Sequence, residues 1–218
     1  MYHSFSLLLS TAYAPPVSYF TKLYHNEGAL IGIEAHENYL KQTYRNRCHI
    51  LAPNGVQALT IPIEQSSELK TSIRDVKLSE HGSWRHLHLQ AIATAYGASP
   101  FYEYYIDDLR PIYERKHHFL WDLNCDFLER LLALLDIDIR WERTETFTKI
   151  GEHPNDWRYG LRPKHPTPDP TFIPKPYYQV YRDRFDFVPD LSVLDLLFNM
   201  GPESLLILRD SKVPCPTP

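Results

Sequence analysis

Basic and amide side chains crowd into one short stretch of the sequence, ahead of a turn. Lys41, Arg45, Asn46 and Arg47 precede the turn sequence Pro53-Asn54-Gly55. Guanidinium groups present forked donors that suit phosphate or carboxylate, and a lysine adds a point charge. This stretch is therefore the leading candidate for an anion-binding site. The alternative is a solvated edge strand, on which Lys and Arg oppose aggregation.

The elements around this stretch are predicted to form a β-hairpin. The turn separates the apolar runs 48–51 and 58–63, and Asn-Gly between two such runs is a strong hairpin signal. On a strand, Arg45 and Arg47 would share one face, because side chains alternate along the chain. Pro62 near the end of the second run indicates an edge strand.

The chain begins with a pattern typical of a βαβ unit. Residues 4–10 and 29–33 are short apolar runs that predict buried strands. Between them, Pro15-Pro16 can open a helix whose apolar face holds Val17, Phe20, Leu23 and Tyr24. Two such strands joined by a helix form a parallel pair.

The central part of the sequence predicts one strand, three helices and another strand. The alternation over 73–78 predicts a half-exposed strand. Helical periodicity follows from Ser83 to Gly97, then from Pro100 to 109, and most strongly over 116–135. Residues 137–141 are predicted to form the strand after these helices.

Residues 151–176 differ in composition from the rest of the chain. They contain seven prolines, which exclude regular structure. We expect a stiff extended wrap or linker. An active-site lid is the alternative, because Trp157, Arg158, Tyr159 and Arg162 give this segment side chains with which to bind a ligand.

The last unit predicts a short apolar helix. Ser192 and Asp195 resemble a capping box before residues 193–198, and Gly201-Pro202 stops the helix. Residues 205–208 form one further apolar turn, and the Pro-Cys-Pro-Thr-Pro tail is expected to be loose.

These elements predict an α/β protein with a small parallel or mixed sheet. The sheet has a βαβ start, a β-hairpin insertion, a three-helix central run and a proline-rich C-terminal wrap. We expect a main α/β domain over 1–150, the wrap or linker over 151–176, and a helical segment over 177–210 that packs on the main domain.

The bulk composition excludes several classes of protein. A net charge of −4 provides no basic field for nucleic acid. Cys48, Cys125 and Cys215 are odd in number and far apart, so they predict neither a disulfide framework nor a zinc site. His86 and His88 are two residues apart and point to different sides of a helix, so no metal site is predicted.

No apolar run reaches the ~18 residues that a membrane span needs, and the run over 5–9 is too short for a signal peptide. We therefore expect a cytoplasmic protein. Hydrolase triad, Walker and dinucleotide-binding motifs are absent from the sequence, and no cofactor is predicted. The oligomeric state is left open.

Several motifs in this order resemble the WbqC-like family of bacterial proteins. The resemblance covers most of residues 4–208 and is carried by the following stretches: Tyr13-x-Pro15-Pro16-x-x-Tyr19-Phe20, Lys41-x-x-x-Arg45-Asn46-Arg47-x-x-Ile50, Pro53-x-Gly55-x-x-x-Leu59-Thr60-Ile61-Pro62-Ile63, Trp84 with His88, Tyr96-x-x-x-Pro100-Phe101-Tyr102, Asp122-Leu123-Asn124, and Tyr178-Gln179 followed by Phe187-x-Pro189-x-Leu191-Ser192 and on to Gly201.

The resemblance implies a role in surface-polysaccharide (O-antigen type) biosynthesis. It implies a transferase or modifying enzyme that binds a nucleotide-sugar-like anionic ligand. Lys41, Arg45 and Arg47 would hold phosphate or carboxylate, Asn46 and Gln179 would orient hydroxyls, and Tyr19 would supply a stacking wall. No base or nucleophile is identified.

The alternative is a non-catalytic binding or scaffold protein within a biosynthetic complex. The chain departs from the family pattern at Leu9–Ala12 and over 151–176. A family activity that used those parts would be altered here.

Overall fold

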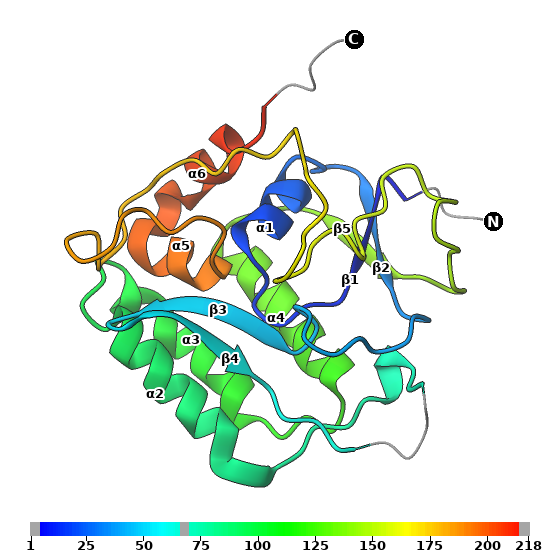
Figure 1. The fold of residues 1–218 in the computed structure, drawn as a ribbon, viewed down its shortest axis with the longest axis horizontal. Helices are drawn as coiled ribbons and strands as arrows, with labels where there is room; N and C mark the ends of the chain where they lie inside the picture. Colours follow the sequence, from blue (N-terminus) through cyan, green and yellow to red (C-terminus); the bar gives the residue numbers. More distant parts are fainter. Residues whose placement is uncertain (1–4, 66–69, 214–218) are drawn as a thin grey trace.

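The computed structural model describes residues 5–65 and 70–213. Its first sheet has the order β1-β2-β5, with β1 at Leu7–Ser10, β2 at Leu30–Glu34 and β5 at Arg140–Arg143. Both pairs are parallel, and Leu8 is opposite Gly32 in the first. The predicted parallel βαβ start is confirmed (Figure 1).

Helix α1 (Val17–Tyr24) connects the first two strands. It begins directly after Pro16, because proline at a helix start loses no intrahelical hydrogen bond. Val17, Phe20 and Leu23 are at most 2% exposed, as the periodicity predicts. Burial of this face holds an eight-residue helix that would be marginal alone.

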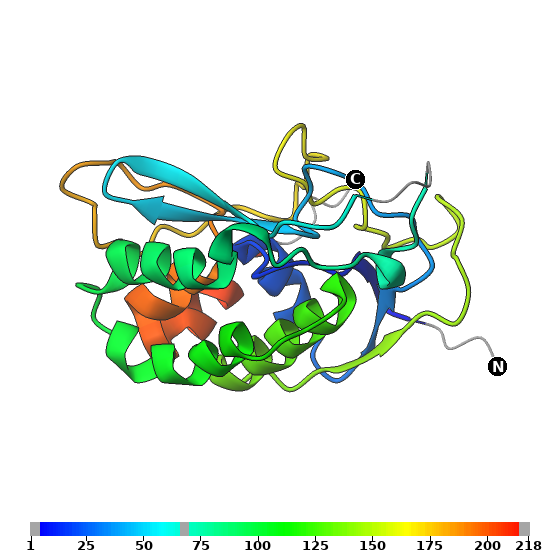
Figure 2. The ribbon, with the colours of Figure 1, turned by 90° about the horizontal axis from the view of Figure 1, so that it is seen from below.

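The predicted hairpin is present as β3 (Arg47–Ala52) and β4 (Gly55–Thr60). Gly55 has a φ of +111°, which favours glycine at this turn. Arg45 and Asn46 precede β3, so the expectation that Arg45 and Arg47 share a strand face is wrong. Figure 2 shows the hairpin lying along one side of the molecule above the helices, and β3 contacts both α2 and α5.

Three helices follow as predicted: α2 (Trp84–Tyr96), α3 (Tyr102–Glu114) and α4 (Leu120–Leu134). Helix α4 starts later than the periodicity suggests, because the Leu120 amide bonds to the Val76 carbonyl.

The predicted strand over 73–78 is wrong. Ile73–Asp75 form a 3₁₀ turn, and only single bridges, such as Ile63 to Leu78, follow. The apolar side chains of this stretch are nevertheless buried in the core. The alternation therefore reflects the burial of these apolar side chains, and the stretch pairs with its neighbours only through single bridges.

The C-terminal unit comprises α5 (Val193–Met200), a 3₁₀ turn (Gly201–Glu203) and α6 (Ser204–Asp210). The Ser192 hydroxyl caps α5 by accepting from the Leu194 amide at 3.3 Å, as predicted. Leu194, Leu196 and Phe198 are at most 1% exposed, so α5 is a central core element. The predicted loose tail lies outside the described residues.

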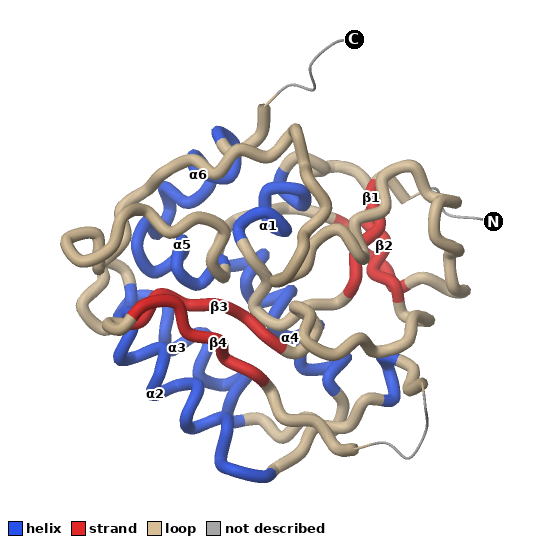
Figure 3. The backbone as a smooth tube through the Cα atoms, in the orientation of Figure 1, coloured by secondary structure: helices blue, strands red, loops and turns tan. Residues whose placement is uncertain are grey.

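Residues 151–176, here called the strap, contain no helix or strand, and Figure 3 shows loop between β5 and α5. One end of the strap extends the sheet beside β1: the Leu8 amide donates to the Asn155 carbonyl at 3.0 Å, and the Trp157 amide donates to the Leu8 carbonyl at 2.9 Å. The other end pairs with the chain after α6, where Ile173 bonds to Ser211.

The molecule is thus a mixed α/β protein with a small parallel sheet, an antiparallel hairpin and several helices, as predicted. In the part of the chain that the structure describes, no helix has both the length and the apolar character to cross a membrane.

Candidate functional site

Five charged side chains meet at the carboxyl ends of β1 and β2, where open parallel sheets commonly bind ligands. Arg45 lies in the loop after β2 and forms a forked pair with Glu37, with Nε–Oε1 at 2.8 Å and Nη2–Oε2 at 2.5 Å. The Arg45 side chain is 2% exposed and the Glu37 side chain is not exposed. Glu37 thus takes the Nε and Nη2 donors of this guanidinium, and Nη2 also lies 3.5 Å from the Arg158 carbonyl.

A second buried arginine comes from the strap. Arg158 Nη1 donates to Glu34 at 2.6 Å, and Nε and Nη2 donate to the two oxygens of Asp156 at 2.9 and 2.6 Å. Burial by itself would lower the pKa of Arg158, but the hydrogen bond and charge of Asp156 outweigh it and raise that pKa. Arg158 therefore stays charged and fastens the strap to the end of β2.

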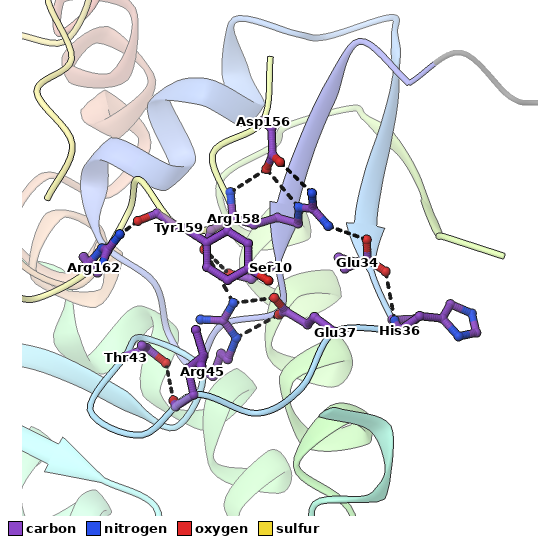
Figure 4. A network of polar contacts seen from close by, with 12 residues as sticks. Ser10, Glu34, His36, Glu37, Thr43, Arg45, Asp156, Arg158, Tyr159 and Arg162 are labelled. Atoms are coloured by element: carbon purple, nitrogen blue, oxygen red, sulfur yellow. Dashed lines mark hydrogen bonds and ion pairs between the residues drawn. The ribbon is translucent and has the colours of Figure 1, made fainter. Parts of the chain in front are cut away.

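Tyr159 connects the two pairs. Its ring centre lies 5.6 Å from the guanidinium carbon of Arg45 and 5.6 Å from that of Arg158, as Figure 4 shows. Burial raises the pKa of Glu37, and its bonds to Arg45 oppose that rise. Since removing one partner of a buried pair typically costs about 3–5 kcal/mol, this cluster holds the strap firmly in place.

A cleft of about 240 Å³ opens between the hairpin and the strap. We call it the hairpin–strap cleft. One wall is the hairpin with its preceding loop, the second is the strap after Tyr159, and the third is the loop before α5. Its lining residues are Ser18, Tyr44, His49, Val56, Leu161, Arg162, Pro163, Pro166, Val188, Pro189, Asp190 and Leu191.

Asp190 is the acidic group of this cleft. Its Oδ1 accepts from the Ser18 amide at 2.8 Å, and its Oδ2 accepts from the Ser18 hydroxyl at 3.0 Å. Burial raises the pKa of Asp190 from an ordinary value of 3.8 to about 6, although both bonds from Ser18 act in the opposite direction. A carboxyl group with such a pKa can exchange a proton near neutral pH.

Nitrogen-bearing side chains of the cleft come from the strap and the hairpin. Arg162 is exposed, and its Nε donates to the Tyr159 carbonyl at 2.6 Å. Burial lowers the pKa of His49, and the charge of Arg47 lowers it further. His49 and Arg47 share the outer face of β3, so Arg47 extends the basic surface beyond the cleft.

The predicted site residues have different surroundings. Lys41 is exposed, and Arg47 is half-buried and donates to the Thr60 hydroxyl at 3.1 Å. Asn46 is buried and donates to the Ile61 carbonyl at 2.9 Å. Of these three, Lys41 and Arg47 are open to a ligand, while Asn46 holds the base of the hairpin.

Tyr19 and Gln179 are buried and internally bonded. The Tyr19 hydroxyl donates to the Ser10 carbonyl at 3.0 Å, and burial raises its pKa although the nearby charge of Arg45 acts in the opposite direction. Gln179 lies apart from this group. Its amide bonds both the carbonyl and the amide of Val188, at 2.9 and 3.0 Å, and also Asp195.

These contacts give the predicted residues supporting positions around the hairpin–strap cleft. Arg45 contacts Tyr159, whose carbonyl orients Arg162. Gln179 holds Val188 in the wall that carries Asp190. The structure does not bring Gln179 to the Arg45 pair, because Gln179 is bonded within the C-terminal unit.

Sequence reasoning missed Asp190 and His49. Asp190 is an unspecified position in the stretch Phe187-x-Pro189-x-Leu191-Ser192, and only its place before an α5 cap sets it apart. His49 alternates with buried Cys48 and Ile50, and that alternation was the available signal. Among the residues that the structure describes, no three His, Cys, Asp or Glu side chains are grouped so as to hold a metal ion.

Comparisons with known proteins identify a family and one curated relative. The model of the WbqC-like protein family matches residues 11–163. A protein of Mycobacterium tuberculosis (strain ATCC 25618 / H37Rv), the uncharacterized protein Rv1507c, is 29% identical over 194 residues, which cover 78% of this chain and 84% of that protein. No solved structure matches the chain.

Proposed function

This chain belongs to the WbqC-like protein family, and from that premise we propose that it binds a nucleotide-linked sugar in the hairpin–strap cleft. We propose that it acts in the cytoplasm as a transferase or modifying enzyme of surface-polysaccharide (O-antigen type) biosynthesis. The observation that supports this most directly is Asp190, a carboxyl group with a pKa of about 6 in a cleft that also contains Arg162 and His49.

Arg162 is the side chain of the cleft that suits an anionic ligand. Arg162 is exposed, and among residues 5–65 and 70–213 only its Nε has a hydrogen-bond partner, so its two terminal nitrogens are available. Two parallel N–H donors match the oxygens of a phosphate. Lys41 lies in the turn before the hairpin and Arg47 begins β3, and both add positive charge outside the cleft. They keep the anion-binding role predicted for them, whereas Arg45 acts by holding the strap.

The size of the cleft limits how much of the ligand it can enclose. Its volume of about 240 Å³ is below the ~300–1,000 Å³ of pockets that enclose drug-sized ligands. The cleft therefore takes the sugar and the adjoining phosphate. The nucleoside would lie along the outer face of β3, next to Arg47.

Asp190 would act as the general base. At pH 7 most of its carboxyl group is ionised, since its pKa is about 6. The carboxylate would take the proton from an acceptor hydroxyl as that oxygen bonds to the sugar carbon, and the nucleoside diphosphate would leave with the electrons of the broken C–O bond. Arg162 would stabilise the negative charge on the leaving group.

A thermal-shift screen with nucleoside diphosphate sugars tests this proposal on the wild type and on Arg162→Ala. A ligand at 100 times its Kd stabilises the wild type by about 2.7 kcal/mol, which raises Tm by about 5–10 °C for a chain of this length. Loss of the charged hydrogen bonds should weaken binding by about tenfold or more in Arg162→Ala.

The matched control is Lys164→Ala, which removes an exposed cation of the same strap that does not line the cleft. It should bind like the wild type. Equal shifts in the wild type and Arg162→Ala would refute the cleft as the binding site. No shift with any nucleotide sugar would favour the non-catalytic scaffold instead.

A further inference from the structure

A second cavity, of about 280 Å³, lies at the other end of α1. We call it the Lys22 pocket. Its walls are the last turn of α1, the strap on either side of Asp156, the strap turn at 169–172, and Lys212 after α6. It shares no lining residue with the hairpin–strap cleft.

Lys22 is the central cation of this pocket. Its side chain is 11% exposed, its ammonium lies 3.4 Å from the centre of the Trp157 ring, and it forms an ion pair with Asp169. Burial lowers the pKa of Lys22, while the hydrogen bond and charge of Asp169 raise it. Asp169 is therefore the carboxylate that directly pairs with Lys22, and the charge of Asp190 acts on the pKa of Lys22 in the same direction.

Lys212 brings a second positive charge to the same pocket, and His25 lines it with an imidazole ring. Burial lowers the pKa of both Lys22 and His25, and the charge of Lys212, which is exposed at the rim, lowers each pKa further. His25 Nε2 bonds the carbonyls of Leu208 and Arg209 at 3.2 and 3.1 Å. Two carbonyl acceptors fix that nitrogen as the protonated one, so the ring donates in this direction.

The lining of the Lys22 pocket contains two lysines but one carboxylate. Asp169 is the acidic side chain in the lining of the pocket, and it also accepts from the amide and hydroxyl of Thr171, at 2.9 and 2.7 Å. No ion pair of Lys212 is found within residues 5–65 and 70–213. The positive charges of Lys22 and Lys212 repel each other. An anion bound between them would therefore reduce this repulsion.

We propose that the Lys22 pocket binds the phosphoryl group of a small molecule, with Lys22 and Lys212 neutralising its charge. The oxygens of Asp169 are occupied by Lys22 and Thr171, so the anion enters on the Lys212 side of the pocket. The indole of Trp157 and the ring of Phe172 line the same pocket and provide an apolar wall for the rest of the molecule.

The volume favours a small ligand over a nucleotide. At about 280 Å³, the pocket falls just below the ~300 Å³ at which pockets enclose drug-sized molecules. A sugar phosphate or free phosphate fits that size. This site is separate from the hairpin–strap cleft and does not depend on the activity proposed for it.

Isothermal titration calorimetry on the full chain tests the proposal with two probes, inorganic phosphate and glucose 1-phosphate, and with glucose as the uncharged control. Both phosphates should bind, glucose should not, and affinity should fall as salt is added. Tighter binding of glucose 1-phosphate identifies a sugar phosphate as the ligand source, and equal binding identifies free phosphate.

Lys212→Ala is the informative variant, because Lys212 is exposed and its loss leaves the core intact. It should weaken phosphate binding by about tenfold, which is the loss of one charge-assisted hydrogen bond. Lys175→Ala removes an exposed lysine outside the pocket and should bind like the wild type. Equal affinity in Lys212→Ala, or no heat with either phosphate up to about 10 mM, would overturn the proposal.

Discussion

Asp190 has a backbone conformation and a pKa that both depend on its surroundings. Its φ is +54°, in the left-handed region that only glycine, asparagine and aspartate visit readily. Both carboxylate oxygens are committed to Ser18 at the start of α1. This residue therefore links the loop before α5 to α1, in addition to any role in proton transfer.

The raised pKa of Asp190 has a definite consequence for stability. Folding raises this pKa from 3.8 to about 6, so the folded state binds more protons than the unfolded state between these values. The free energy of unfolding is therefore largest below about pH 4 for this group, falls as pH rises to about 6, and is constant above.

We predict that Asp190→Asn removes this part of the pH dependence. Asparagine keeps the shape, can serve both bonds of Ser18 and favours the left-handed backbone. Between pH 4 and pH 7 the wild type should lose about 2–3 kcal/mol relative to the variant. Urea unfolding at both pH values measures this difference.

Asp195 titrates in the same range, since burial raises its pKa to about 6, but it is common to both proteins and cancels in the comparison. Asp186→Asn, at an exposed aspartate near the same loop, serves as the control and should follow the wild type. Parallel pH profiles for Asp190→Asn and the wild type would show that the Asp190 carboxyl is well solvated.

At this scale the sequence predicted side-chain types better than their partners. The sequence singled out Arg45 by its residue type, and the structure pairs it with Glu37, eight residues earlier. Arg45 also reaches the carbonyl of Arg158, whose guanidinium bonds Glu34 from 124 residues away. Pairings of that separation leave no local pattern in the sequence.

Among the elements, the end of α5 shows how a single glycine sets the path of the chain. Gly201 has a φ of +53°, and a Cβ built there would lie 2.5 Å from the Phe101 ring. The ring is held at this place because the Phe101 amide bonds the Phe198 carbonyl at 3.0 Å. The turn from α5 to α6 and the start of α3 therefore share one close contact.

We predict that Gly201→Ala costs about 3 kcal/mol or more, because its φ of +53° and ψ of −128° strain a non-glycine residue by about 1–3 kcal/mol and the added carbon overpacks against Phe101. Gly28→Ala is the matched control, because Gly28 has a φ of +77° but no heavy atom within 4 Å of the added carbon. It should cost about 1 kcal/mol. Urea unfolding of both variants measures the difference, and equal losses would show that Phe101 moves aside freely.

Element types were predictable wherever periodicity and a boundary residue agreed. The hairpin at Gly55, α1 after Pro16 and α5 after Ser192 all follow local chemistry. The stretch 73–78 was mispredicted because its bridges to Ile63 and to Phe119 arise from chain packing. Backbone pairing of that kind is decided by the tertiary structure and not by alternation.

In the whole molecule, one hydrophobic core contains side chains from both the predicted main domain (1–150) and the predicted C-terminal segment (177–210). Leu194, Leu197 and Phe198 of α5 are at most 1% exposed. The Ser192 amide bonds the His49 carbonyl, and the Val193 amide bonds the Pro15 carbonyl, both at 2.8–2.9 Å. We propose that residues 151–213 complete the domain that begins at the N-terminus.

We predict that the fragment 1–150 does not fold by itself. Without α5 it would expose several apolar side chains that are each worth about 1.5–3 kcal/mol when buried, against a typical total stability of about 5–15 kcal/mol. Circular dichroism during urea unfolding should show no cooperative transition. The control is the chain 1–213, and a sharp transition in 1–150 would instead establish an independent N-terminal domain.

The strap closes one edge of the sheet, and this has a consequence for synthesis of the protein. The Ser10 hydroxyl and the Arg158 carbonyl that it bonds are 148 residues apart in the chain. At a translation rate of about 5–20 residues per second, this interval lasts about 7–30 s. During that time the nascent chain carries β1 with an open hydrogen-bonding edge, the kind of edge that pairs with other chains. We therefore expect the nascent chain to be most prone to aggregation while it is still on the ribosome, before the strap has emerged from the exit tunnel.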